Sequence, residues 1–577
     1  MYTGTRLIDL LEQQHQQRSQ SDLFKRGTFT LSWRAKVGSF PHPDLETIVS
    51  AGEPCGTWKL TSSRPEDKRN VSENWQQLRE LPLYGYLPGS AIRGLVRAWA
   101  KKRPDIQQRM VELLGKQEND SISAGKIEFL DAWPEEPTKL TLDIVNPQQE
   151  FQVFHEGQGT PLSFYTLGNG KEEINLVVAI RGKQNLRVTP DEVAEVWGWV
   201  EQALTLYGVG SRTASGYGAM SSDAVRSPQT DPGWSRKTLS FALYSQGCYG
   251  VNRQQGHEQL RPSHWRGWLR SWMLRFFLGV MSRTNAEITV GELMGTLESN
   301  DDHKSRQGLI RLQLVEKEPW GDRSQNQPNF YTWKGELHLE APTELLNEII
   351  LPIVKFAASA GGVGLGWRRP LHIFTMTTGH VAARGCHLLL THLVENRETG
   401  RLSPKQFALG PTPQPWRNTY DRWAAAVENR WKSRFLHGAN QDLAGEVFAP
   451  HTCAVYLLPG PDADPIDRRD LEWSETNPEE TRGDGMHLIY QSNTQRKYKR
   501  NPEIGGAAGS GKAHCSWASI KRVNVPNQQE KTDCQEIVCL FMGGQQVRGT
   551  KVRSQFLRDL QKCQGSLHLF GLTPPQA

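Results

Sequence analysis

A seven-residue pattern that occurs twice constrains the fold of this chain more than any other feature. Both copies have the form R-G-x-[VL]-R-x-W, at 93–99 and at 266–272, and each follows a proline, Pro88 or Pro262. A repeated pattern of this kind is typical of a chain built from duplicated structural units. We therefore expect the two segments to fold alike.

The surroundings of the two copies repeat as well. Upstream lie strand-like alternations of apolar and polar residues, at 30–33 and 238–241. Downstream lie helix-like stretches that run into glycines. These stretches are 190–207 followed by 208–210, and 342–358 followed by 361–364. Three features in one order favour duplication over chance.

The length of 577 residues predicts three to four domains at roughly 150 residues a domain. We expect a first domain over 1–220, a polar, turn-rich linker over 221–236 and a second domain over 237–377. Residues 378–577 are expected to form a divergent α/β domain with insertions. Its apolar runs predict strands at 388–393, 454–458, 487–490 and 537–542, and 420–434 predicts a helix.

Composition limits the possible functions. The 68 basic and 62 acidic residues give a net charge of only +6, so affinity for a polyanion depends on where the charges lie. The 43 arginines outnumber the 25 lysines, and there are 19 tryptophans; this favours phosphate contacts and base stacking, or equally a surface of arginine salt bridges. No segment has the roughly 20 apolar residues of a membrane-spanning helix. The eight cysteines form no C-x-x-C pair. We predict no metal site, no cofactor, no disulfide framework and a soluble, cytoplasmic protein.

The two copies of the pattern are candidate RNA-binding helices. Arg93 and Arg97 are four residues apart, as are Arg266 and Arg270, so each pair shares one helix face. Gly94 or Gly267 in the first turn lets a phosphate backbone approach the free N–H groups there. The alternative is an ordinary amphipathic helix with exposed arginines.

Two glycine-rich loops are the second candidate. Gly208, Gly210, Ser211, Arg212, Gly216 and Tyr217 lie in the first loop, and Gly362, Gly364, Arg368 and Arg369 lie in or after the second. Such loops present N–H groups and hydroxyls to phosphates. A tight turn from helix to strand is the alternative.

Three further motifs carry weaker signals. Residues 506–512 satisfy G-x-x-x-x-G-K, but Ala513 replaces the hydroxyl that binds Mg²⁺, and no apolar strand precedes the motif. The neighbouring run 496–500 is a basic loop in which Lys497, Lys499 and Arg500 could contact RNA. The cluster 301–303, Asp-Asp-His, is more typical of a polar loop than of a metal or acid/base site.

At these residues the chain resembles the RAMP superfamily of CRISPR proteins. Residues 29–220 look like subunit six of the type III-B Cmr effector, through segments at 86–94, 125–132, 142–147 and 208–218. Residues from 237 to about 377, and onward to the C-terminus, look like subunit one of that complex, through 260–272 and 361–369. The chain thus resembles a fusion of the two subunits. The family often has Pro-His after the asparagine of the segment 142–147, whereas Gln148 follows Pro147 here, so a role tied to that histidine is absent or altered.

The resemblance implies an α+β fold of tandem ferredoxin-like, RRM-type domains with glycine-rich loops and insertions. It implies a non-catalytic, RNA-binding subunit that caps the effector filament near the guide RNA 3′ end and helps capture target RNA. The implied partners are guide CRISPR RNA, target RNA and other Cmr subunits, including the repeated backbone subunit, with no membrane. The arginines and glycine loops above, together with Arg261, map onto family RNA-binding positions.

Two rival functions remain open on the sequence. Some RAMP proteins are endoribonucleases that cut guide or target RNA with a histidine or an aspartate, and His42, His155 and Asp143 would be the candidates here, although no catalytic constellation surrounds them. The other rival is an assembly scaffold whose arginine helices bind protein neighbours.

Overall fold

The computed structural model places most of the chain in two compact units. Unit 1 comprises Met1–Val145, Pro161–Trp234 and Tyr249–Pro262, and unit 2 comprises Asn146–Thr160, Ser235–Cys248 and Ser263–Ala577. The residues that the structure describes are 4–36, 39–41, 48–50, 85–118, 121–136, 138, 140–145, 149–156, 162–170, 172–225, 228–245, 260–296, 307–316, 331–396, 400–437, 445–462, 477–490, 498–506, 515–526, 532–543 and 551–573.

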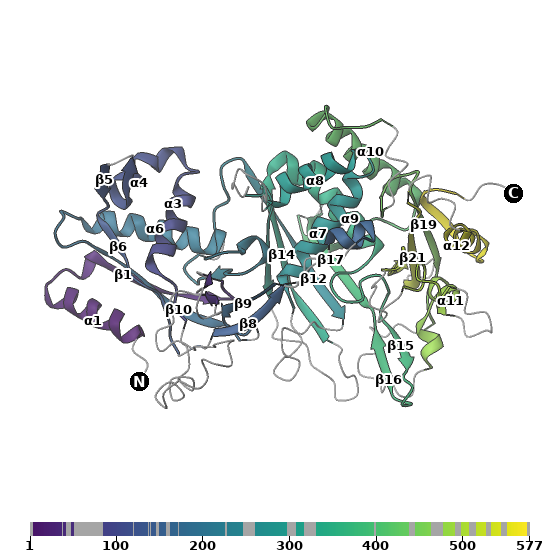
Figure 1. Cartoon of the computed structure of the whole chain (residues 1–577), viewed down its shortest axis with the longest axis horizontal. Helices are drawn as coiled ribbons and strands as arrows, with labels where there is room; N and C mark the ends of the chain where they lie inside the picture. Colours follow the sequence, from purple (N-terminus) through teal and green to yellow (C-terminus); the bar gives the residue numbers. More distant parts are fainter. Residues whose placement is uncertain are drawn as a thin grey trace, which may run out of the picture. The chain divides into compact units, whose positions relative to one another are not determined.

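Unit 1 is built on an antiparallel sheet. Its four main strands are β1 (Phe24–Leu31), β6 (Ile127–Phe129), β10 (Ile174–Gly182) and β11 (Met220–Ser221), in the spatial order β11-β1-β10-β6, with β7 (Trp133–Pro134) also paired to β10. Helices α3 (Gly89–Ala100) and α4 (Gln107–Leu114) lie between β1 and β6 in the chain, and α6 (Pro190–Tyr207) lies between β10 and β11. α3 and α6 pack on one face of the sheet, and α1 (Gly4–Gln17) packs on the other (Figure 1).

Local sequence explains these elements. Thr189 and Glu192 form a reciprocal capping box at the start of α6, and Pro190 occupies its first turn. Strand β10 is buried on both faces. Leu176, Val178 and Ile180 meet the helices α3 and α6, whereas Val177 and Ala179 meet α1. A near-continuous apolar run is what a strand covered on both sides requires.

Unit 2 contains a second sheet of the same design. Its strands are β12 (Trp234–Ser245), β13 (Arg311–Glu316), β14 (Tyr331–Pro342), β17 (Cys386–Glu395) and the edge strand β18 (Leu402–Gln406), in the order β13-β14-β12-β17-β18. Helices α7 (Pro262–Phe277) and α8 (Arg283–Met294) lie between β12 and β13 in the chain. The π-helix Leu345–Ile350 and α9 (Leu351–Ala360) follow β14. A separate hairpin, β15 (His372–Thr375) and β16 (Val381–Arg384), precedes β17, and α10 (Pro413–Arg430) follows β18.

A third sheet lies in the C-terminal part of unit 2. It consists of β19 (Cys453–Pro459), β20 (Ala518–Pro526), β21 (Thr532–Phe541) and β22 (Leu567–Gly571), in the order β20-β21-β19-β22. Helix α11 (Asp484–Tyr490) lies between β19 and β20 in the chain, and α12 (Lys551–Lys562) lies between β21 and β22. Both helices contribute to one core with the sheet, through Met486 and Ile489 of α11 and Phe556 and Leu560 of α12.

All three sheets share one topology. When the four principal strands are numbered along the chain, each sheet has the order 4-1-3-2, with helices after the first and third strands. This is the split βαβ, or ferredoxin-like, connectivity. The chain therefore has an α+β fold. The predicted strands at 388–393, 454–458 and 537–542 lie in or largely within β17, β19 and β21.

One expected strand is wrong. The apolar run at 487–490 belongs to helix α11, which begins with Asp484 in its first turn. Met486 and Ile489 are three residues apart and both buried, so the helical spacing places them against the sheet. A run of four apolar residues does not distinguish a short strand from a turn of helix.

The segment expected to be a linker is anchored in unit 1. Asp231 is buried and accepts hydrogen bonds from Lys102, Arg103 and the hydroxyl of Tyr207. Strand β12 begins three residues later, at Trp234. This end of 221–236 is a fixed turn and not a loose connector. Among the described residues, no helix has both the length and the apolar character needed to cross a membrane.

Candidate nucleic-acid interface

The first arginine pair caps a neighbouring helix. Arg93 donates to the carbonyl of Leu114, the last residue of α4, and Arg97 donates to the carbonyl of Gly115. Gly115 ends this helix with a φ of +78°, in a region that favours glycine. Terminal carbonyls lack partners within their own helix, and a cation there also complements the helix dipole.

The second arginine pair does the same in unit 2. Arg266 donates to the carbonyl of Met294, the last residue of α8, and Arg270 donates to the carbonyl of Gly295 at 3.3 Å. Gly295 ends α8 with a φ of +83°. Burial, followed by the charge of Arg270, lowers the pKa of Arg266 to about 10. Both copies of the sequence pattern thus use their arginines to terminate the next helix.

The glycines of the pattern have different surroundings. A Cβ added at Gly94 would meet no atom within 4 Å, and the residue is exposed. Gly267 is buried within α7. Close packing therefore does not explain the glycine at 94, which leaves an open patch on the first turns of α3.

The loop 208–218, here called the glycine loop, is a tight turn closed by its own backbone. Gly208, Gly210, Arg212, Gly216 and Gly218 all have positive φ. The amide of Val209 donates to the carbonyl of Gly218 at 2.9 Å, and a Cβ at Gly208 or Gly218 would overlap the facing backbone. Most of these glycines are needed for the turn itself, while Gly210 and Ser211 are exposed.

A buried ion cluster fixes one side of the glycine loop. The Tyr217 hydroxyl donates to Asp143 at 2.6 Å, and Arg261 donates to both oxygens of the same carboxylate at 2.9 and 3.0 Å. Arg34 adds a third group at 3.9 Å. Burial and the charge of Asp143 raise the pKa of Tyr217. Tyr217, Arg261 and Asp143 are all buried, so their side chains hold the fold and are not available to a strand of RNA.

The solvent side of the glycine loop carries two adjacent cations. Lys36 and Arg212, here called the loop cation pair, lie 4.5 and 4.9 Å from the centre of the Phe164 ring. Lys36 is joined to the loop because Ser211 donates its amide hydrogen to the Lys36 carbonyl at 2.6 Å. Burial and the charge of Arg212 lower the pKa of Lys36. Neither cation has a carboxylate partner within the described part of the chain. Two adjacent cations without a carboxylate partner are a candidate anion site.

The arginines after the second glycine-rich loop serve the core of unit 2. Arg368 and Arg275 both pair with the fully buried carboxylate of Glu446. Burial alone would raise the pKa of Glu446, but the charges of the two arginines outweigh burial, so its pKa is lowered. Arg369 is buried and donates to the carbonyls of Ala518 and Ile504 at 2.6 and 2.7 Å. Both guanidinium groups are thus taken up by the protein. Gly362 packs against Cys386, and Gly364 has a φ of +81°.

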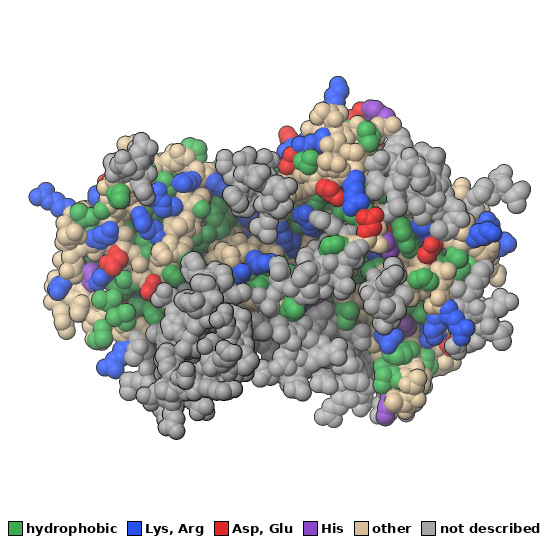
Figure 2. Space-filling model, in the orientation of Figure 1, with side chains coloured by type: hydrophobic (Ala, Val, Ile, Leu, Met, Phe, Trp, Pro, Cys, Tyr) green, Lys and Arg blue, Asp and Glu red, His purple; other side chains and the backbone are tan. Residues whose placement is uncertain are grey.

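The remaining sequence candidates lie in several places. Lys499 and Arg500 are exposed in a turn. Lys497, His42, the cluster 301–303, Gln148 and residues 507–512 of the G-x-x-x-x-G-K motif lie outside the described residues. Figure 2 shows Lys and Arg side chains in separate groups, with hydrophobic and polar side chains between them, over the described part of that face.

The candidate catalytic residues that the structure describes are engaged in the fold. His155 contacts Glu446 through Nε2 at 2.9 Å and stacks on Trp517, with ring centres 4.2 Å apart. Asp143 is committed to the cluster around Tyr217. No group of three or more His, Cys, Asp or Glu side chains suited to a metal ion occurs among the described residues.

Sequence reasoning missed the residues that complete the surface sites. Lys36 and Phe164 meet Arg212 only through the fold, and so do His372, Arg384, Arg482 and Tyr490, which line a cavity described below. No spacing in the sequence connects these residues. The antiparallel bridges of Lys36 with Ser211 and of Ala35 with Leu167 bring them together in unit 1.

The strand order and the glycine loop define an α+β protein with ferredoxin-like units. Within that class, residues 73–221 match the model of the RAMP superfamily. The match contains α3, β10, α6 and the whole glycine loop, so this part of the chain is similar to RAMP proteins. A search of curated proteins finds no match to the chain.

Proposed function

We propose that this chain is a non-catalytic, RNA-binding subunit of a type III-B CRISPR effector. In this proposal the three ferredoxin-like sheets are tandem RAMP domains, and the chain combines the roles of Cmr subunits six and one. It caps the filament near the guide RNA 3′ end, beside the repeated backbone subunit, and helps capture target RNA. The endoribonuclease alternative has less support, because His155 contacts the buried Glu446 and Asp143 accepts hydrogen bonds from Tyr217 and Arg261.

The observation that carries the proposal is the loop cation pair. Lys36 and Arg212 meet at the solvent side of the glycine loop, which lies in the segment similar to RAMP proteins. A phosphodiester between them would replace their mutual repulsion with attraction. Contacts of this kind act on the backbone and not on the bases, which suits a subunit that must accept guides of any sequence.

The test is binding of single-stranded RNA by the full chain. The double variant Lys36→Ala/Arg212→Ala should weaken binding by roughly tenfold at moderate salt, because both cationic contacts to the bound phosphate are lost. The matched control is Lys101→Ala/Arg187→Ala, which removes the same charge from two exposed positions of unit 1. Equal affinities for the two double variants would contradict the proposed site.

A second experiment addresses the rivals. Labelled RNA incubated with the full chain and Mg²⁺ or Mn²⁺ should stay intact. Cleavage that persists after further purification would favour the endoribonuclease. Assembly with partner subunits without any crosslink between RNA and this chain would favour the scaffold.

A further inference from the structure

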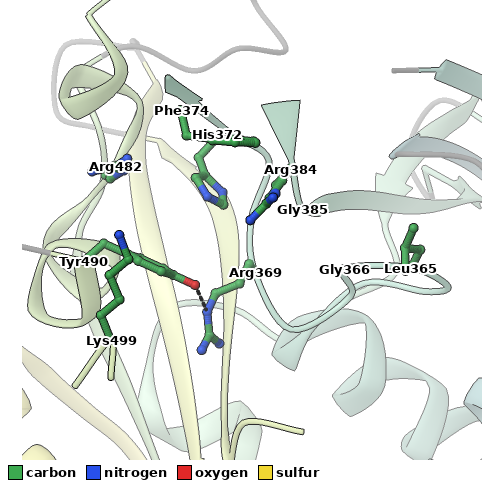
Figure 3. A pocket seen from close by; sticks show the side chains of 10 residues that line it. All are labelled: Leu365, Gly366, Arg369, His372, Phe374, Arg384, Gly385, Arg482, Tyr490 and Lys499. Atoms are coloured by element: carbon green, nitrogen blue, oxygen red, sulfur yellow. Dashed lines mark hydrogen bonds between the residues drawn. The ribbon is translucent and has the colours of Figure 1, made fainter. Parts of the chain in front are cut away.

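Unit 2 contains a cavity of about 280 Å³. The residues that line it are distant in sequence from the glycine loop of unit 1. Its walls come from the hairpin β15–β16, from α11 and from the turns before and after that helix. Figure 3 shows the side chains that line it, including His372, Arg384, Arg482 and Tyr490. The proposed function assigns no role to this cavity.

The cavity is a built feature of the fold. The buried guanidinium of Arg522 donates to the carbonyls of Leu371 and Thr481 at 2.9 and 2.8 Å, which joins the hairpin to the segment before α11. The amide of Ile373 also donates to the Thr481 hydroxyl at 3.0 Å. These bonds fix the two walls against each other.

The lining is strongly basic. Arg369, Arg384, Arg482 and Lys499 line the cavity, and none of its lining residues is Asp or Glu. Arg369 is committed to backbone carbonyls, and Arg482 donates to the exposed Glu479 at 2.5 Å. Arg384 and Lys499 are exposed and have no acidic partner among the described residues. Burial alone would raise the pKa of Tyr490, yet the charges around it, that of Arg369 above all, leave its pKa lowered.

His372 adds a hydrogen-bond acceptor to this positive surface. Its Nδ1 lies 2.9 Å from the Pro370 carbonyl, which only accepts, so Nδ1 carries the hydrogen. The side chain is 6% exposed, and burial with the nearby arginines lowers its pKa to about 3, so the ring is neutral. Nε2 is therefore an acceptor, and no hydrogen-bond partner for it occurs among the described residues. A phosphodiester group satisfies the cations but carries no hydrogen for this acceptor, so a second group of the ligand must donate to it.

We propose that the cavity binds one ribonucleotide unit of an RNA strand, with its phosphate at Arg384, Arg482 and Lys499 and a ribose hydroxyl donating to Nε2 of His372. An anionic ligand that also carries a hydroxyl donor fits the two kinds of group in the lining. A 2′-hydroxyl distinguishes RNA from DNA. The Tyr490 ring, which stacks at 28° to His372 with ring centres 5.9 Å apart, closes the wall behind the sugar.

This inference rests on the proposed function because it takes RNA as the ligand, but its test is separate. The probes are a single-stranded oligouridine 8-mer and the deoxyuridine 8-mer of the same sequence, and the protein is the full chain carrying Lys36→Ala/Arg212→Ala. Failure of the unmodified chain to bind either probe would refute the proposed function. RNA binding whose affinity does not change when the cavity residues are substituted would refute only the ribonucleotide site.

The variants separate charge from recognition of the sugar. Arg384→Ala/Lys499→Ala should weaken binding of both probes by about tenfold. His372→Asn can keep the donor to Pro370 while removing the acceptor, so it should lower the preference for RNA over DNA by about fivefold and leave DNA binding unchanged. The control Arg417→Ala/Lys551→Ala removes the same charge from exposed, described positions that do not line the cavity.

Three outcomes would overturn the inference. The first is an unchanged affinity of Arg384→Ala/Lys499→Ala for the probes. The second is equal binding of the RNA and DNA probes before any residue of the cavity is changed. The third is an unchanged preference for RNA in a His372→Asn variant that has a native circular dichroism spectrum. If His372→Asn does not fold, a 4-thiouridine 8-mer decides: crosslinks to the peptide that contains Tyr490 support the site, and crosslinks confined to unit 1 refute it.

Discussion

At the scale of single residues, the arginines of this chain divide by what their guanidinium groups contact. Those at 266, 270, 275, 368 and 369 donate to carbonyls or to a buried carboxylate. Arg212 and Arg384 instead lie over aromatic rings, at 4.9 and 4.2 Å, without an acidic partner among the described residues. The sequence indicated all of these arginines except Arg275 and Arg384 as candidate RNA contacts and did not separate the two groups, because the separation depends on burial and on partners distant in the chain.

His372 predicts a dependence of stability on pH. Its folded pKa of about 3 lies below the ordinary histidine pKa of 6.5, so the unfolded chain binds a proton first as the pH falls. The contribution of the neutral ring is complete above about pH 6.5 and is lost progressively as the pH falls toward 3, at no more than about 1.4 kcal/mol per unit. Lowering the pH from 7 to 5.5 should therefore reduce the free energy of unfolding of the unmodified chain by about 1 kcal/mol more than that of His372→Asn. Denaturant unfolding at the two pH values measures this difference. Parallel curves for the two proteins would contradict a neutral, buried imidazole.

At the scale of secondary-structure elements, the repeated pattern encodes a junction between two helices. α3 terminates α4 and α7 terminates α8, each through two arginines and a glycine of positive φ at the end of the second helix. The sequence predicted the helices and the likeness of the segments. It did not predict the acceptors, because Met294 and Leu114 are ordinary apolar residues whose carbonyls become available only where their helices end.

We expect Arg266→Ala/Arg270→Ala to act on stability more than on RNA. Two charged hydrogen bonds to helix-terminal carbonyls are lost, which should lower the free energy of unfolding by about 2 to 4 kcal/mol. Arg266→Lys keeps a charge but not the planar fork of donors and should fall between. Denaturant titration measures the loss. Unchanged stability together with lost RNA binding would restore these arginines to the RNA interface.

Two glycines of unit 1 make a paired prediction. Gly94 lies on an exposed helical face with open space around its α-carbon, so Gly94→Ala should raise stability by roughly 0.5 to 1 kcal/mol through helix propensity. Gly218 has a φ of +70° and faces the Val209 carbonyl, so Gly218→Ala should destabilise by more than about 1 kcal/mol. Thermal unfolding of both variants checks the pair. A stabilised Gly94→Ala that binds RNA more weakly would show that the open patch on α3 contacts the strand.

At the scale of the whole molecule, one topology occurs three times with little shared sequence. The chain segments that form the first two sheets each contain one copy of the repeated pattern. The segment that forms the third sheet contains no copy, and this sheet still has the strand order 4-1-3-2. Its helices follow the first and third strands as in the other two sheets. The sequence indicated a divergent α/β, RAMP-like domain in this part of the chain, although it contains no clean third copy of the pattern. The loop cation pair and the cavity could not be predicted from the sequence either, because each joins segments that only the fold brings together.

The salt dependence of RNA binding should reveal both sites in the whole molecule. For single strands, the slope of log K against log salt falls by about 0.7 for each phosphate contact removed. Because each site is proposed to hold one phosphate, Lys36→Ala/Arg212→Ala and Arg384→Ala/Lys499→Ala should each reduce the slope by about 0.7, and all four changes together should reduce it by about 1.4, provided that the RNA is long enough to reach both sites. The exposed-charge control Lys101→Ala/Arg187→Ala should leave the slope within error of the unmodified chain. A slope that responds equally to all three double variants would mean that RNA is attracted by the net charge of the chain and is bound at neither site.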